Sequence, residues 1–465
     1  MNTMSTTERQ HSNAYLYFIT AVSAMGGLLF GYDWVVVGGA KPFYEVFFEI
    51  TNSPSLQGWV MGSAILGCLI GVMISGSLSD KFGRRPLMFV AAVIFIIAAI
   101  GTGAVSDLTS FIVYRVLGGI GIGVASTLSP MYIAEVAPAN QRGKFVSINQ
   151  LTIVVGMLAA QIINWMLADP VLPGEDILTT WNGQMGWRMM FWVGGIPAVF
   201  FFILLFFIPE SPRWLGSQGR LERAESIFSS IGGLSYGKEQ VRAMVNTVND
   251  KVEKISLSQL FKGKMFRVMI IGIFIAVFQQ WCGINVVFNY AQEIFEAAGY
   301  GVSDVLFNIV ITGVINVAFT FVGMYAVDKL GRRSLMLLGS SGLAISYAAI
   351  GACYYFGVTG IPVLVLVLIG IACYAMTLAP VTWVVLSEIF PTRIRGLAMS
   401  VATFALWAAC FVLTYTFPIL NKELGASGTF WLYGVICVIG FVFLRSQLPE
   451  TKGKSLEEIE NELLK

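Results

Sequence analysis

Charge is scarce in this chain. Lys, Arg, Asp and Glu make up 12% of its 465 residues, and the mean hydropathy is +0.75. Soluble domains carry about 25% charged residues, so this composition excludes an ordinary soluble protein. The net charge of +2 is too small to indicate a nucleic-acid partner.

Residues that build most catalytic and metal sites are also few. The single histidine, His11, lies in a polar N-terminal stretch, which argues against a histidine triad or a multi-histidine metal site. Six cysteines all fall in apolar runs, and none has metal-type spacing. We therefore expect small buried thiols, no metal and no cofactor.

Long apolar runs fill most of the chain. Each can cross a hydrocarbon core of about 30 Å as a helix, and none shows the alternation of a barrel strand. The expected spans are residues 15–37, 56–79, 87–106, 110–134, 145–168, 188–208, 267–297, 303–327, 335–357, 362–387, 397–420 and 427–448. This predicts an all-α membrane protein with twelve transmembrane helices that contact the lipid bilayer.

Basic residues set the expected orientation. If the N-terminus is cytosolic, 25 of the 29 Lys and Arg residues lie in cytosolic segments, and Lys41, Arg188 and Lys422 lie outside. This bias follows the positive-inside rule and places both termini in the cytosol.

The spans form two sets of six. A polar stretch, 209–266, separates them, and 220–231 within it has the apolar spacing of an amphipathic helix, as does 238–255. We expect an N-terminal half at 1–208, a cytosolic helical linker at 209–266, a C-terminal half at 267–448 and a cytosolic tail at 449–465.

Three motifs occur once in each half, in the same order. DKFGRR (80–85) recurs as DKLGRR (328–333), EVAPANQRG (135–143) as EIFPTRIRG (388–396), and PESPRWL (209–215) as PETKGKS (449–455). This pattern indicates a parallel duplication, with a substrate site between the halves near the membrane midplane.

Asp33 and Arg115 are the only charges that we place deep within spans. Charge at that depth is costly, and it usually marks an ion or proton pathway. Spans 1 and 4 run in opposite directions, and both residues fall in the outer half, so pairing is geometrically reasonable. The alternative is a structural ion pair that locks the two spans together.

The motifs together carry a resemblance. GGLLFGYD (26–33), YRVLGGIGIGVAS (114–126), SPMYIAEVAP (129–138), QQWCGINVV (279–287) and PVTWVVLSEIFPTRIRG (380–396), with the repeats above, resemble the sugar porters of the major facilitator superfamily. The pattern is closest to the bacterial D-xylose–proton symporters of that family, and it covers nearly the whole chain.

The resemblance implies proton-coupled symport of a xylose- or glucose-like monosaccharide by alternating access. It also implies a bacterial inner-membrane location, action as a monomer, no cofactor beyond the co-transported proton, and no enzyme activity. A facilitative uniporter of the same fold remains an alternative. A sugar sensor is disfavoured by the short tail expected after Glu450, and an intramembrane enzyme by the lack of other catalytic groups at depth.

The resemblance also assigns site residues. A sugar needs amides, which both donate and accept hydrogen bonds, and a flat aromatic surface. Alternatively, the amides join helices and the tryptophans lie at the lipid interface. A break near Gly283 would help the amides of span 7 converge. The expected substrate-binding residues are Phe30, Gln150, Gln279, Gln280, Asn285, Asn289, Asn316, Trp383 and Trp407, and proton coupling is assigned to Asp33 and Arg115.

The repeated charge motifs are expected to form a cytosolic gate that closes in the outward-open state. As short basic loops, they also set the topology. The gate residues are Asp80, Arg84, Arg85, Glu135, Arg142 and Glu210, with Asp328, Arg332, Arg333, Glu388, Arg395 and Glu450 in the second half.

Several positions depart from the family pattern. Gly194 replaces a second acidic residue, and Met157 replaces a glutamine. Asn289 stands where the xylose symporters have tyrosine, Ala379 where the family has glycine, and Leu406 and Cys410 where relatives carry an amide. We expect a less polar pocket beside span 11.

Overall fold

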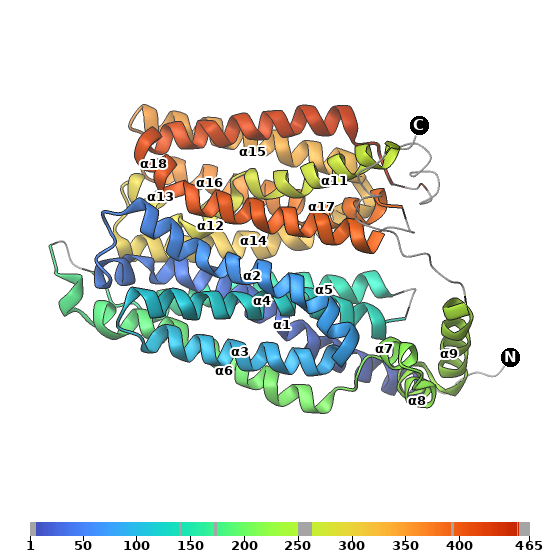
Figure 1. The fold of residues 1–465 in the computed structure, drawn as a ribbon. Coiled ribbons are helices and arrows are strands. Elements are labelled where there is room, and N and C mark those ends of the chain that lie inside the picture. Colours follow the sequence, from blue (N-terminus) through green and yellow to red (C-terminus); the bar gives the residue numbers. More distant parts are fainter. Residues whose placement is uncertain are drawn as a thin grey trace. The chain divides into compact units, whose positions relative to one another are not determined.

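The computed structural model describes residues 6–138, 141–171, 174–249, 263–391, 395–452 and 454. Over these residues the regular structure is helical, with no strand (Figure 1). The helices are α1 (Thr6–Phe47), α2 (Pro54–Phe82), α3 (Arg84–Ala104), α4 (Leu108–Val136), α5 (Arg142–Leu167), η1 (Ile177–Thr179), η2 (Asn182–Gly186), α6 (Trp187–Leu204), η3 (Leu205–Phe207), α7 (Pro212–Ser217), α8 (Leu221–Gly232), α9 (Leu234–Asn249), α11 (Gly263–Trp281), α12 (Ile284–Asn289), α13 (Ala291–Ala297), α14 (Val302–Leu330), α15 (Arg332–Tyr355), α16 (Ile361–Met376), α17 (Leu378–Ile389) and α18 (Arg395–Gln447).

Eleven helical segments of the described chain are long and apolar enough to cross a membrane. One of them, α18, has 53 residues and contains a break at Gly425, where φ is 69°. It therefore holds the last two predicted spans, and the predicted all-α membrane fold is confirmed.

Two spans are interrupted within their length. Gly283 has a left-handed conformation, with φ 85°, between α11 and α12, which confirms the break expected there. A side chain at this position would also meet the ring of Tyr433. The second interruption, at Thr377 between α16 and α17, has no glycine and was not predicted from the sequence.

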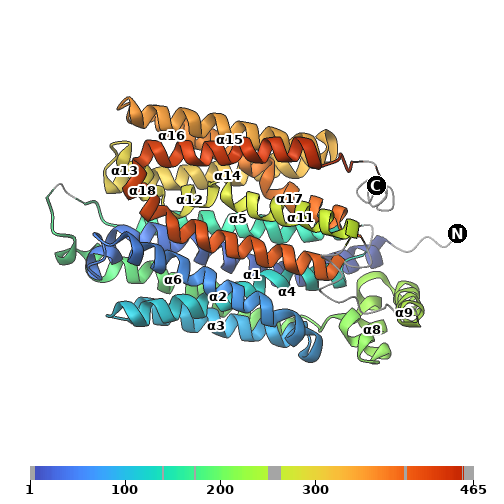
Figure 2. The same cartoon turned by 45° about the horizontal axis from the view of Figure 1, so that its top comes forward.

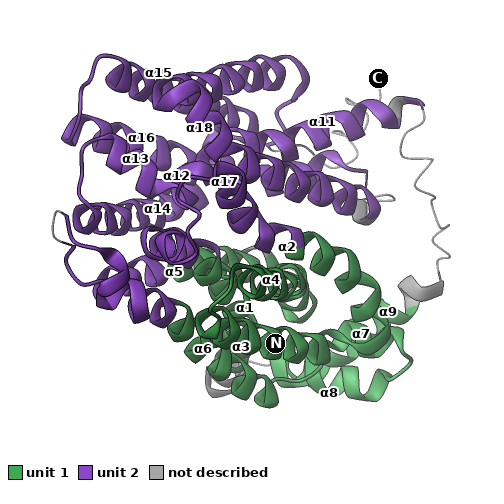
Figure 3. Ribbon diagram, turned by 60° about the vertical axis from the view of Figure 1, so that its left-hand side comes forward, with its two compact units in different colours: residues 1–33, 67–156, 191–253 green, residues 34–66, 157–190, 254–465 purple. Residues whose placement is uncertain are grey.

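The chain folds into two compact units (Figure 3). Unit 1 comprises residues 1–33, 67–156 and 191–253, and unit 2 comprises 34–66, 157–190 and 254–465. Segments 34–66 and 157–190 therefore group with the second half of the chain. The division into sequence halves at 208 and 267 stays a prediction.

In unit 1, α3 packs against α4 (Figure 2). Helix α8 begins and ends within a residue of the predicted 220–231 helix, and it buries Ala224, Phe228 and Ile231. It packs against α7 and α9. Helix α9 corresponds to the first part of the second predicted helix, 238–255. The remainder, 250–255, lies outside the described residues.

In unit 2, α15 packs against both α16 and α18 (Figure 2). Residues 34–47 of α1 also belong to this unit, and the backbone at Gly38 lies against the carbonyls of Phe288 and Asn289 in α12. A β-carbon at Gly38 would lie only 3.2 Å from the Asn289 carbonyl oxygen. The absence of a side chain thus lets α1 and α12 approach closely.

Helices α2 and α4 also touch through glycines. A β-carbon on Gly71 would lie 2.4 Å from the carbonyl oxygen of Ile120, and one on Gly123 would lie 2.4 Å from that of Cys68. Small residues let helix backbones approach in a membrane, where apolar side chains gain little by leaving lipid. Glycines on both helices therefore allow this close packing.

We expect Gly71→Ala to reduce stability by about 1–3 kcal/mol, because the new methyl group meets backbone atoms that cannot rotate away. The measurement is thermal unfolding in detergent. Gly76→Ala on the same helix is the matched control, since a β-carbon there meets nothing within 4 Å. An equal loss in both variants would contradict the packing argument.

Candidate functional site

Asp33 and Arg115 form an ion pair within unit 1. The Nη1 atom of Arg115 lies 3.0 Å from the Oδ2 atom of Asp33. The Arg115 side chain is 3% exposed and the Asp33 side chain 20%. The guanidinium also lies 5.8 Å from the centre of the Phe191 ring, and its Nε atom has no hydrogen-bond partner. Asp33 is therefore the more accessible member of a pair in which the arginine is buried.

The space beside Gly194, the position that lacks the second acidic residue, is occupied by another side chain. A β-carbon at Gly194 would lie 2.7 Å from the ring of Tyr32, the residue before Asp33. Tyr32 is buried against α6 and occupies the space that a side chain at 194 would enter. An acidic residue cannot be placed there unless Tyr32 moves.

Four side chains in unit 2 form a relay of hydrogen bonds. Asn285 donates to the Oε1 atom of Gln280, and Gln280 donates to Gln279 at 2.5 Å. Gln279 in turn donates to the Tyr374 hydroxyl at 3.0 Å. The break at Gly283 brings the end of α11 and the start of α12 into this arrangement. Three predicted sugar ligands thus converge, and Tyr374 ends the chain of contacts.

Two more predicted sugar residues have contacts in unit 2. Asn316 on α14 donates to the sulfur of Met157 at 3.9 Å, so the position that lost its amide still faces a polar group. Trp407 on α18 is 7% exposed, and its ring meets that of Trp34 edge-on, with centres 5.8 Å apart. The Trp34 ring therefore helps to fix the orientation of Trp407.

The remaining predicted sugar residues are described by their burial and by the helix that carries them. Asn289 is 4% exposed at the end of α12, and its Oδ1 atom has no hydrogen-bond partner. Trp383 is half-buried on α17. Phe30 on α1 and Gln150 on α5 are half-buried and belong to unit 1.

Three features of these regions were not predicted from the sequence. Tyr374 and Trp34 lie among many aromatic residues in apolar runs, and no local signal distinguished them. The placement of Lys41 was wrong: it lies in α1 with 2% exposure, not in an outer loop. Helix α1 continues to Phe47, and within it Lys41 pairs with Glu45, one turn later, at 2.9 Å.

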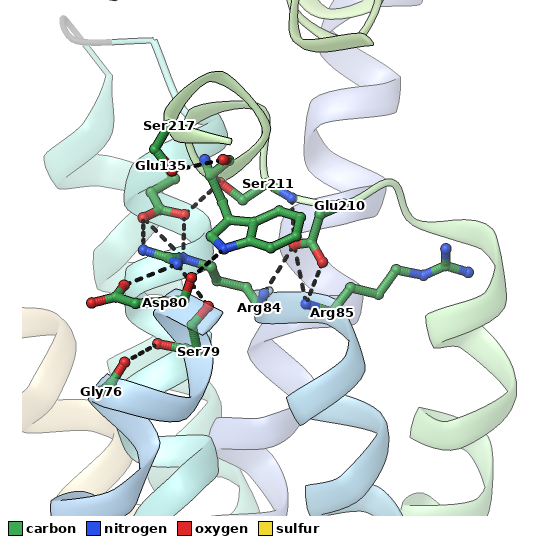
Figure 4. Close-up of polar contacts among 10 residues, drawn as sticks. Gly76, Ser79, Asp80, Arg84, Arg85, Glu135, Glu210, Ser211 and Ser217 are labelled. Carbon is green, nitrogen blue, oxygen red and sulfur yellow. Dashed lines mark hydrogen bonds and ion pairs between the residues drawn. The ribbon is translucent and has the colours of Figure 1, made fainter. Parts of the chain in front are cut away.

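The first repeated motif builds a compact charge cluster in unit 1 (Figure 4). Arg84 binds Glu135 through Nη2 at 2.9 Å and Nε at 3.0 Å, and it also pairs with Asp80 at 3.2 Å. Ser211 donates at 2.5 Å to the Oε2 atom of Glu135, which also accepts from Nε of Arg84. These charge-assisted bonds join the ends of α2, α3, α4 and α7.

Glu210 caps the start of α3 in the same cluster (Figure 4). It accepts hydrogen bonds from the backbone N–H groups of Arg84 at 3.0 Å and Arg85 at 3.2 Å. A carboxylate is favourable there because the first N–H groups of a helix lack partners. Burial raises the pKa of Glu210, although the backbone donors oppose that effect. Gly83, with φ 101°, leaves room, since a β-carbon would lie 2.3 Å from the Glu210 carboxylate.

The second motif repeats this arrangement within unit 2. Arg332 binds Glu388 at 3.1 Å, and Glu450 accepts from the backbone N–H of Arg332 at 2.9 Å. Thr451 donates to Glu388 at 2.6 Å, in the place of Ser211. Gly331 has φ 86°, matching Gly83. The duplication read from the sequence is therefore reproduced in individual contacts.

Some predicted gate residues differ from expectation. The Arg85 side chain donates to the carbonyl oxygens of Leu205 and Phe206, and Arg333 donates to that of Arg445, so these arginines bind helix ends and not acidic groups. Arg142, at the start of α5, has no hydrogen-bond partner at Nε. The side chains of Asp328 and Arg395 lie outside the described residues.

We expect Tyr374→Phe to raise the KM for sugar by about two- to tenfold, because one hydrogen bond is worth about 0.5–1.5 kcal/mol. The maximal rate should change less, since the variant only frees Gln279 to rotate. Uptake kinetics in proteoliposomes measure both. Tyr347→Phe is the control, because that buried hydroxyl has no hydrogen-bond partner. Equal kinetics in both variants would show that the relay does not order the pocket.

Comparison with known proteins places these features in a family. The family model described as sugar (and other) transporter matches residues 19–463. The arabinose-proton symporter of Bacillus subtilis (strain 168) is 38% identical over 97% of this chain and 96% of its own length. The D-xylose-proton symporter of Escherichia coli (strain K12) is 39% identical, with the same coverage.

Solved structures agree with the sequence comparison. The inward-open structure of the xylose transporter XylE from E. coli has a TM-score of 0.84 at 37% identity, and the alignment covers 96% of this chain and 99% of that chain. The structure of the proton:xylose symporter XylE bound to 6-bromo-6-deoxy-D-glucose has a TM-score of 0.79. This multi-pass membrane chain therefore belongs to the sugar (and other) transporter family.

Proposed function

We propose that this protein carries a monosaccharide together with a proton by alternating access. The names of its relatives support this: an arabinose-proton and a D-xylose-proton symporter are 38% and 39% identical to it over nearly their whole length. The amides of Gln279, Gln280 and Asn285 supply hydrogen-bond partners for sugar hydroxyls. The transported solute is therefore a pentose or hexose, bound without covalent chemistry.

The Asp33–Arg115 ion pair carries the proposal of proton coupling. The Arg115 side chain is buried, whereas the Asp33 carboxylate is partly exposed. Asp33 is therefore the member of the pair that a proton from solvent can reach. Protonation removes the charge that holds Asp33 to Arg115. Asp33 is then free to separate from α4 while the sugar is bound, and release of the proton inside re-forms the pair.

Coupling follows from the cost of charge in the membrane. An unprotonated Asp33 that left Arg115 would strand two unpaired charges, which is costly at that depth. The carrier therefore changes state readily in two forms: empty with the pair intact, or loaded with both proton and sugar. An inward proton gradient then drives sugar uphill.

We further propose a location in the bacterial inner membrane, with both termini in the cytosol, and action as a monomer. The distribution of Lys and Arg supports the orientation. The two charge clusters, centred on Arg84–Glu135 and Arg332–Glu388, would then lie on the cytosolic side and hold it shut in the outward-open state.

A facilitative uniporter is the second candidate. Gly194 lacks the second acid of the xylose symporters, and Tyr32 fills its space. A glucose facilitated diffusion protein of Zymomonas mobilis is also 34% identical over 95% of this chain. Both candidates share the sugar site, and they differ in whether a proton gradient raises the internal sugar concentration.

The deciding experiment uses proteoliposomes with an imposed inward proton gradient and a panel of labelled pentoses and hexoses. We expect accumulation above the external concentration for at least one sugar, with alkalinisation of the medium on sugar addition. Equilibration without accumulation would favour the uniporter.

Asp33→Asn should abolish accumulation, because its side chain cannot exchange a proton, while sugar counterflow between equal pH values persists. Asp107→Asn makes the same chemical change at the exposed start of α4, where the side chain accepts from Ser110, and it should accumulate sugar normally. Undiminished accumulation by Asp33→Asn would refute the assignment.

A further inference from the structure

A second cluster of buried charges lies at the end of α1 in unit 2. Lys41 is 2% exposed and Glu45 is 4% exposed. The Lys41 Nζ atom lies 2.9 Å from Glu45 and also forms an ion pair and hydrogen bond with Glu293 on α13. Gln57 donates to the other oxygen of Glu45 at 3.2 Å. Neither Asp33 nor Arg115 takes part in these contacts.

Joining two helices through buried charges is unfavourable in desolvation free energy. Removing charges from water costs several kcal/mol each, and a buried pair is often no more stabilising than apolar side chains of the same size. Here a single lysine serves two carboxylates, so neither carboxylate has a cation of its own. Such a cluster is better suited to a contact that forms and breaks than to a permanent one, because on separation Glu293 regains water and Lys41 still has Glu45.

The backbone around Glu293 is divided into short segments. Helix α13 has seven residues and follows Tyr290, whose φ and ψ are −122° and 30°. Gly283 breaks the chain before α12, and Gly299, with φ 87°, lies just after α13. Short elements bounded by such positions can rotate by changing a few backbone angles, as hinges do.

The same segment leads directly to predicted sugar ligands. Asn285 and Asn289 lie on α12, which meets α13 at Tyr290. Tyr290 donates to the carbonyl oxygen of Thr414 at 2.7 Å, and its ring centre lies 5.6 Å from the Lys41 ammonium. Movement of α13 away from α1 would therefore alter the surroundings of both amides.

We infer that Lys41 is a gating residue, and that its bond to Glu293 holds α13 against α1 when the pocket is closed to the outside. In the outward-open state this bond is broken, and Glu293 faces water while Lys41 keeps Glu45. The inference rests on the proposed alternating access, and it assigns the outer closure to this ion pair and not to apolar packing alone.

The test measures amide hydrogen exchange of the full-length protein in lipid nanodiscs, without sugar or a pH gradient. Glu293→Gln keeps the side-chain shape but removes the charge that binds Lys41. We expect exchange of α13 and of residues 34–47 to rise by about tenfold or more, because breaking a buried pair is costly. Exchange in α15 should stay unchanged.

Glu296→Gln is the matched control on the same helix, since Glu296 accepts from Gln292 and attracts Lys41 only at longer range, without an ion pair. It should raise exchange far less than Glu293→Gln does. Glu293→Asp, which retains the charge on a shorter side chain, should give an intermediate increase, and it serves as the second variant if Glu293→Gln fails to fold.

Transport supplies the second readout. Glu293→Gln should lower the KM for sugar added outside by several-fold relative to the KM for sugar inside, because outward-open molecules become more common. A lower thermal stability with unchanged α13 exchange and unchanged KM ratio would overturn the inference and leave a structural role. Because the exchange assay needs no proton gradient, its result is independent of the Asp33→Asn outcome.

Discussion

Charge can be buried in this protein only where an opposite charge or a helix end meets it. Arg115 has Asp33, Arg84 has Glu135, Arg332 has Glu388, and Lys41 has Glu45 with Glu293. Burial limits the contact of each of these groups with water, so each pair fixes the register of the segments that it joins. The same constraint makes the pairs suited to a carrier, because parting them requires a proton, water or a new partner.

The duplicated clusters show how closely the two halves of the sequence follow one plan. In each, an arginine binds a glutamate, a hydroxyl supports that glutamate, and a second glutamate caps the next helix after a glycine of positive φ. The partner residues of each cluster lie between 51 and 126 positions apart in the chain. Each motif therefore supplies one of the four chain segments that meet in a cluster, and its role depends on contacts with the other three in the folded chain.

Local signals explain what the sequence predicted well. Long apolar runs predicted the membrane helices, and Gly283 predicted the break in span 7. Asp33 and Arg115, the charges placed deep within spans, were predicted to pair. Contacts that depend on which helix faces meet had no such signal. Tyr374 reaches Gln279 from α16, and Trp34 reaches Trp407 from α1, but each is one aromatic among many. Lys41 was misplaced because an apolar run ends before it. Its i,i+4 spacing to Glu45 fits a continuing helix, but its pairing with Glu293 depends on the fold.

The contact between Tyr32 and Gly194 constrains how this lineage can change. Gaining an acid at position 194 collides with the tyrosine ring, whereas shrinking the tyrosine first opens a void beside Asp33. Position 194 and the Tyr32 ring are thus coupled through their shapes, and a second titratable group engineered there has to be accommodated by a shift of that ring.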